Sequence, residues 1–182
     1  LGLPADAFLV LQLGRLVPRK GVDTVVRALA LLQTAAPVVP ARLVVVGGGS
    51  SAPDETVTPE IGRLRRLAQS LGVGRRAQFV GQRAHEDLRD WYVAADVFVT
   101  TPWYEPFGIT PLEAMACGTP VIGSAVGGVQ YTVLDGQTGY LVPPRDPAAV
   151  ARRLIALCRD PAHAAALGRA GVRRVCDHFT WD

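Results

Sequence analysis

The chain has 182 residues, 49% of them hydrophobic, and its 19 basic and 16 acidic side chains give a formal net charge of +3. This length and composition suffice for one substantial core, which excludes an intrinsically disordered chain. The basic excess is small and not interleaved with aromatic residues, so no nucleic-acid-binding surface is predicted. No apolar run reaches the roughly 20 residues that a membrane helix needs.

Short apolar segments with strand character alternate with segments of helical periodicity along the whole chain. In chain order we predict a strand over 8–13, a loop over 14–21, a helix from 22, a strand over 42–46, a helix over 61–71, a strand over 77–80, a helix over 88–95, a strand over 97–100, a helix over 109–117, strands over 120–122 and 140–142, and helices over 146–158 and 161–178. This alternation implies a mostly parallel sheet with helices on both faces, because right-handed crossovers place them there. The predicted fold class is α/β, a Rossmann-like three-layer sandwich with a parallel sheet of about six strands.

Sheets of this class bind ligands outside the carboxyl ends of their strands. The loop over 14–21, Gly-Arg-Leu-Val-Pro-Arg-Lys-Gly, lies at such an end and places Arg15 and Lys20 before a helix. Cationic side chains and helix amides can converge there on one anion, and phosphate is the natural candidate. The alternative is solvent-exposed charge at a helix start. No GxGxxG sequence follows the first strand, which disfavours a dinucleotide-dependent dehydrogenase.

A second loop, Glu-Pro-Phe-Gly-Ile-Thr-Pro-Leu-Glu over 105–113, holds two carboxylates around a glycine. Gly108 allows close backbone approach, and Pro111 is tolerated in a first helical turn, so we expect the helix to begin near Ile109. Helical side chains lean towards the N-terminus, so the carboxylate of Glu113 can reach back towards whatever the free amides bind.

Two acids beside an anion site are explained by a ligand that also carries hydroxyl groups, because ionised carboxylates accept hydrogen bonds from hydroxyls. A sugar nucleotide has a diphosphate between two polyols. The alternative is that Glu113 merely complements the helix dipole while Glu105 is a surface turn residue.

These motifs together resemble the retaining glycosyltransferases of family 4 (glycosyl transferases group 1), whose GT-B architecture has two Rossmann-like domains. The matching segments are GRLVPRKG (14–21), VVVGGG (44–49), AADVFV (94–99), EPFGITPLEAMACGTPVIGS (105–124), GGVQYTVLDGQTGYLVPPRDP (127–147) and HFTWD (178–182). The resemblance covers only the C-terminal, donor-binding half of such an enzyme. It implies that residues 1–182 are a nucleotide-sugar-binding domain and that the N-terminal acceptor domain is absent from this chain.

The resemblance implies that the enzyme transfers a hexosyl group from a nucleotide-diphospho-sugar donor. Arg15 and Lys20 would then neutralise the donor diphosphate and, with Glu105, form the catalytic set. The backbone amides of Ile109 and Thr110 would assist at the diphosphate.

The remaining donor contacts follow from the same resemblance. Glu113 would accept from the ribose hydroxyls, and Gln82 and Arg83 would hold the base. The backbone of Phe107 and Gly108 would lie beside the hydroxyls of the transferred sugar, which Glu105 would face.

The resemblance implies no metal and no cofactor apart from the donor itself, and it names the missing acceptor domain as a partner. Two alternatives remain: another GT-B enzyme, such as a nucleotide-sugar epimerase or a phosphorylase, and a non-catalytic nucleotide-sugar-binding module. We expect the isolated domain to be inactive.

The three cysteines, Cys117, Cys158 and Cys176, have no metal-binding spacing, and we expect them to be reduced and buried. No signal peptide is predicted from the sequence. A cytoplasmic location is therefore expected, with any membrane contact of the full-length protein made through the missing half.

Overall fold

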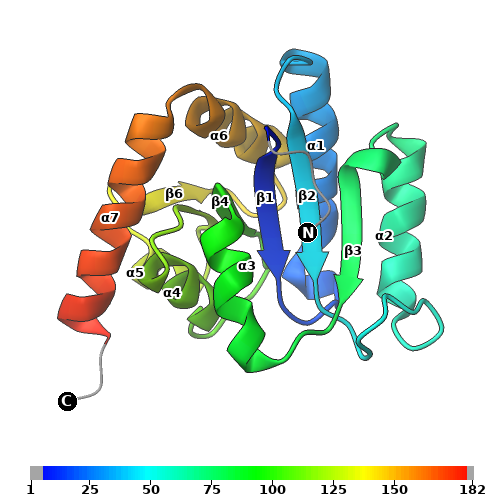
Figure 1. The fold of residues 1–182 in the computed structure, drawn as a ribbon, viewed down its shortest axis with the longest axis horizontal. Helices are drawn as coiled ribbons and strands as arrows, with labels where there is room; N and C mark the ends of the chain where they lie inside the picture. The colour runs from blue at the N-terminus through cyan, green and yellow to red at the C-terminus, as the bar shows by residue number, and fades with distance from the viewer. Residues whose placement is uncertain (1–5, 180–182) are drawn as a thin grey trace.

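The computed structural model describes residues 6–179, which form a six-stranded parallel sheet with helices on both faces (Figure 1). The strands are β1 (Phe8–Leu13), β2 (Ala41–Val46), β3 (Ala77–Gly81), β4 (Val97–Thr100), β5 (Val121–Ser124) and β6 (Gly139–Val142). The helices are α1 (Val22–Ala35), α2 (Pro59–Ser70), α3 (Leu88–Ala94), α4 (Ile109–Ala116), α5 (Val129–Thr132), α6 (Pro147–Arg159) and α7 (Pro161–His178). The predicted Rossmann-like α/β fold is confirmed.

The strand order is β3-β2-β1-β4-β5-β6, and every neighbouring pair is parallel. The chain starts in the middle of the sheet, moves outward to β3, crosses back to β4 and then moves outward to β6. The direction of winding therefore reverses between β1 and β4, and ligands of doubly wound sheets bind at this reversal, outside the carboxyl ends of the strands. In Figure 1 the arrowheads of β1, β2 and β3 mark that edge.

Two hydrophobic cores fill the space between the sheet and the helices. The first lies under α1, α2 and α6, and the second lies under α3, α4 and α5. Figure 1 shows α1 and α3 on opposite sides of the sheet, while α7 packs along α4 and touches β6. The central strands β1, β4 and β5 are buried throughout, as expected for strands covered on both faces.

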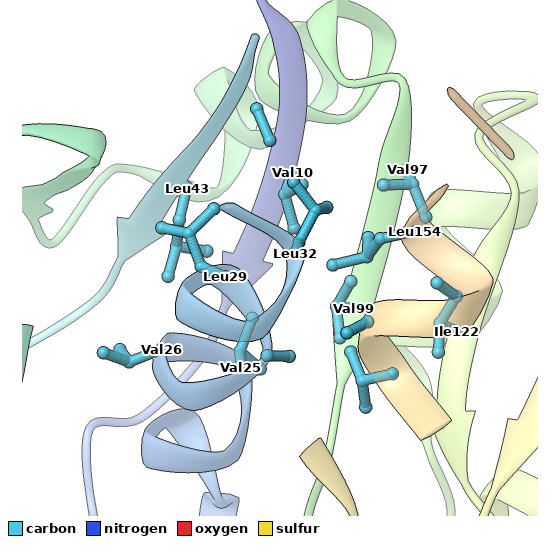
Figure 2. Close-up of a cluster of buried hydrophobic side chains, with 14 of the residues drawn as sticks. Val10, Val25, Val26, Leu29, Leu32, Leu43, Val97, Val99, Ile122 and Leu154 are labelled. Carbon is cyan, nitrogen blue, oxygen red and sulfur yellow. The ribbon is translucent and has the colours of Figure 1, made fainter. Parts of the chain in front are cut away.

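The apolar stripe of α1 packs as its periodicity predicts. Leu29 and Leu32 face the sheet beside Val10 and Leu43, and Leu154 of α6 joins the same core (Figure 2). All five side chains are almost completely buried. The stripe thus fixes which side of α1 faces the sheet.

Two features differ from the sequence-based expectations. The four-residue helix α5 was not predicted, since it is too short to show a helical period. The three cysteines are not fully buried as expected: Cys117 and Cys158 are half-buried, and Cys176 is exposed. Within residues 6–179 no helix combines the length and apolar character needed to cross a membrane, and the last three residues of HFTWD lie outside the described range.

Neighbouring leucines on α1 offer a matched test of the core. Leu32 is fully buried, whereas Leu31 is 43% exposed. We expect Leu32→Ala to lower the free energy of unfolding by about 2–5 kcal/mol, because it removes buried apolar contacts and leaves a cavity. Leu31→Ala should cost less than about 1 kcal/mol. Urea unfolding followed by circular dichroism measures both, and equal costs would contradict this packing of α1.

Candidate functional site

The loops that follow β1 and β4 are joined to each other by two hydrogen bonds. The hydroxyl of Thr101 donates a 2.7 Å hydrogen bond to the carbonyl of Gly21, and the amide of Trp103 donates one of 2.9 Å to the carbonyl of Arg19. Gly21 has a positive φ of 66°, and a Cβ there would lie 1.9 Å from the carbonyl oxygen of Thr101. A glycine is therefore required where the loops meet.

An ion pair joins the same two loops at the side-chain level. The ammonium of Lys20 contacts Oε2 of Glu105, and the two side chains are only 18% and 17% exposed. Lys20 ends a short 3₁₀ turn over Pro18–Lys20, which places it at the carboxyl edge of the sheet. Two of the residues predicted as catalytic are thus in direct contact although 85 positions separate them.

A third loop, over 125–128 after β5, supports the backbone around Glu105. The amide of Gly128 donates to the carbonyl of Glu105 at 2.9 Å. A Cβ on Gly127 would lie 2.0 Å from that carbonyl oxygen, and one on Gly128 would lie 2.1 Å from the carbonyl oxygen of Phe107. The glycine pair of the 127–147 segment therefore serves to let this loop approach the segment that carries Glu105.

Helix α4 begins at Ile109, as predicted. Gly108 precedes it with a φ of 86°, and no side chain among the described residues caps the first turn. Ile109 is exposed and Thr110 is half-buried. The first amides of a helix have no partner within the helix, so those of α4 can donate to a ligand that approaches this edge.

A hollow of about 160 Å³ lies between the loops that follow β1, β2 and β3. It is lined by Leu13, Gly14, Arg15, Val46, Gly47, Gly48, Gln82, Arg83 and Leu88. The structure thus brings the predicted residues Arg15, Gln82 and Arg83 together around one opening. Sequence reasoning did not assign a role to the glycines after β2 or to Leu88.

The Arg83 side chain is occupied by contacts within the protein. Its guanidinium donates to the carbonyls of Ser51 and Gln82 at 2.8 and 2.7 Å and lies 5.9 Å from the centre of the Trp91 ring. The amide of Gln82 donates to the carbonyl of Ser50 at 2.8 Å. Arg83 therefore fastens the loop after β3 to the loop after β2.

Glu113 has a partner that the sequence did not indicate. Its Oε2 accepts a 2.8 Å hydrogen bond from the hydroxyl of Tyr92, a residue of α3 with only 1% exposure. Burial, followed by the charge of Glu113, raises the pKa of Tyr92 far above its ordinary value, so the phenol remains a donor. In the sequence Tyr92 is simply one apolar position of a helical stripe.

The chain is similar to known proteins. A family model described as glycosyl transferases group 1 matches residues 1–174. D-inositol 3-phosphate glycosyltransferase of Streptomyces avermitilis is 41% identical over 182 residues, which is 100% of this chain but 39% of that relative.

Two solved structures show the same fold. Sucrose-phosphate synthase from Thermosynechococcus elongatus is 46% identical with a TM-score of 0.87, over 98% of this chain and 43% of the other. Anabaena HepE, in complex with UDP and glucose, is 27% identical with a TM-score of 0.85, over 96% of this chain and 45% of the other.

The fully buried hydroxyl of Thr101 provides a test of the fastening between the loops. We expect Thr101→Val to cost about 0.5–1.5 kcal/mol of unfolding free energy, because the carbonyl of Gly21 loses its side-chain donor and keeps only the amide of Thr24. Thr101→Ser keeps the hydroxyl and should retain most of that energy. Urea unfolding of the two variants checks this, and a Val variant as stable as the Ser variant would contradict it.

Tyr92 predicts a dependence of stability on alkaline pH. Its pKa is raised by folding, so the stabilisation is complete below the pKa of the unfolded chain, about 10, and is lost as the pH rises beyond it. The advantage of wild type over Tyr92→Phe should therefore shrink by about 1.4 kcal/mol between pH 9 and 11. Urea unfolding at several pH values measures it, and a constant difference would argue against this environment for Tyr92.

Proposed function

Because the chain belongs to the glycosyl transferases group 1 family, we propose that residues 1–182 are the C-terminal donor-binding domain of a retaining glycosyltransferase. The whole protein would transfer a hexosyl group from a nucleotide-diphospho-sugar. The chain spans 39% of the length of its Streptomyces relative, and the acceptor-binding domain is proposed to lie in the N-terminal part of the full-length protein.

The observation that carries this proposal is the meeting of Lys20, Glu105 and the uncapped start of α4 at the reversal point between β1 and β4. A cation and free helix amides suit a diphosphate. A carboxylate beside them suits the hydroxyl groups of a sugar. Few ligands other than a sugar nucleotide present both chemistries within the length of one loop.

Breaking the anomeric C–O bond leaves negative charge on the diphosphate. Fixed donors aimed at the leaving group stabilise the transition state more than the ground state, and loss of one such donor can cost about a hundredfold in rate. Arg15, Lys20 and the amides of Ile109 and Thr110 are proposed to supply this stabilisation. Since these groups are themselves the counter-charge, the proposal requires no metal.

The nucleoside is proposed to occupy the hollow beside Arg15. Gln82 lines it, and Arg83 holds the loop that would contact the base through its backbone. Glu113 would accept from the ribose, while the backbone of Phe107 and Gly108 would lie beside the sugar. The HepE complex supports this class of ligand, since that 27% identical structure was solved with UDP and glucose.

The proposed place of action is the cytoplasm. Any contact with a membrane would be made by the rest of the full-length protein.

Nucleotide binding tests the site directly. We expect the 182-residue chain to bind one of UDP, GDP or ADP in calorimetric titration, and Arg15→Ala to weaken that affinity roughly tenfold to a hundredfold through the loss of a charge-assisted hydrogen bond. Arg169→Ala removes the same charge from an exposed position on α7 and should change nothing. Absence of saturable binding to all three nucleotides would refute the proposed function.

Transfer should need more than this chain. Closure over the donor and activation of the acceptor are assigned to the other domain, so we expect the 182 residues to bind the nucleotide sugar but to transfer little or none of it. Product formation by the isolated chain, followed by mass spectrometry, would show that this division of labour is wrong.

A further inference from the structure

The hydrogen bond between Tyr92 and Glu113 connects a residue of the proposed site to a side chain of the buried core. Glu113 lies on α4 and is only partly buried, so an unsupported side chain there would sample several rotamers. The Tyr92 hydroxyl reaches its Oε2 at 2.8 Å from the neighbouring helix α3. One carboxylate oxygen is therefore held from within the protein, while none of residues 6–179 hydrogen-bonds to Oε1, which leaves that oxygen for a ligand.

Tyr92 is itself held by contacts within the core. Its ring packs edge-on against Phe98 of β4, with 5.4 Å between centroids and an interplanar angle of 73°. Its carbonyl accepts a 2.7 Å hydrogen bond from the buried hydroxyl of Thr119, in the Gly-Thr-Pro-Val-Ile stretch. Thr119, Tyr92 and Glu113 thus form one chain of contacts that ends at the carboxylate.

We propose that Tyr92 is a positioning residue that fixes the carboxylate of Glu113 and thereby sets the preference of the site for a ribonucleotide over its 2′-deoxy counterpart. This rests on the proposed function, in which Glu113 receives the ribose hydroxyls. A carboxylate held in one orientation meets a hydroxyl without first losing rotamer freedom, whereas a mobile one gains less from the same contact. A 2′-deoxyribose offers one hydroxyl fewer to that carboxylate and gains less from its fixed position.

The test compares the affinities of UDP, GDP and ADP with those of their 2′-deoxy forms by calorimetry. For the nucleotide that binds, the wild-type chain should prefer the ribo form about tenfold or more, as for a hydrogen bond to a charged group. Tyr92→Phe should reduce this ratio at least roughly threefold, because the contact between Glu113 and the 2′-hydroxyl becomes weaker rather than absent. The affinity for the deoxy form should change little. A merely structural role would weaken both forms equally.

Tyr140→Phe is the matched control. Tyr140 of β6 is also buried, and its hydroxyl lies 2.8 Å from Nε2 of His163 on α7. Tyr140 and Tyr92 belong to different hydrophobic cores. This variant loses a buried phenol hydroxyl but should keep the wild-type ratio. If Tyr92→Phe does not fold, Thr119→Val gives the second measurement. It removes one of the two donors to the Tyr92 carbonyl, the other being the amide of Ala95, and it keeps the phenol, so the ratio should fall in the same direction.

The outcomes separate this inference from the function on which it rests. If the wild type prefers the ribo form and folded Tyr92→Phe keeps the same ratio, the role of Tyr92 alone is overturned. Where Tyr92→Phe does not fold, an unchanged ratio in Thr119→Val has the same meaning. A wild type that binds no nucleoside diphosphate overturns both. A lowered ratio in Tyr92→Phe with an unchanged ratio in Tyr140→Phe supports the inference.

Discussion

The adjacency of β1 and β4 in the middle of the sheet is the constraint on which the rest of the molecule depends. Because β1 is flanked by β2 and β4, the chain winds outward in both directions from this pair, and the loops that leave their carboxyl ends diverge to opposite faces. Loops of this kind leave an opening between them. Here the β1 loop, which carries Arg15 and Lys20, and the β4 loop, which carries Glu105, are joined by the ion pair between Lys20 and Glu105.

Backbone packing turns this opening into a site of defined shape. Gly21 lets the β1 loop touch Thr101, and Gly128 lets the β5 loop touch Phe107. At both contacts a side chain in place of hydrogen would overlap a carbonyl oxygen. The glycines of the motifs therefore bring backbones together around the site, and the charged side chains are placed as a consequence.

Charges at the site are held in two different ways. Lys20 and Glu105 hold each other across two loops. An anionic ligand can therefore take the place of Glu105 beside Lys20, and a cationic one can take the place of Lys20 beside Glu105. Glu113 is held by a neutral donor from the core, Tyr92, whose burial keeps it protonated. An anionic ligand near Lys20 would compete with Glu105, whereas a hydroxyl near Glu113 would add to the existing contact.

Much of the architecture could be predicted from the sequence alone. The alternation of apolar runs gave the strands within about two residues, and Gly108 with Pro111 placed the start of α4, because both signals are local. The charged loop over 14–21 could be placed at the carboxyl edge by topology. What the sequence could not determine is which residues meet: Lys20 with Glu105, Gly128 with Phe107, and Tyr92 with Glu113. These contacts depend on the order of strands and on the angle between helices, so a buried tyrosine in an ordinary helical stripe shows its role only once α3 lies beside α4.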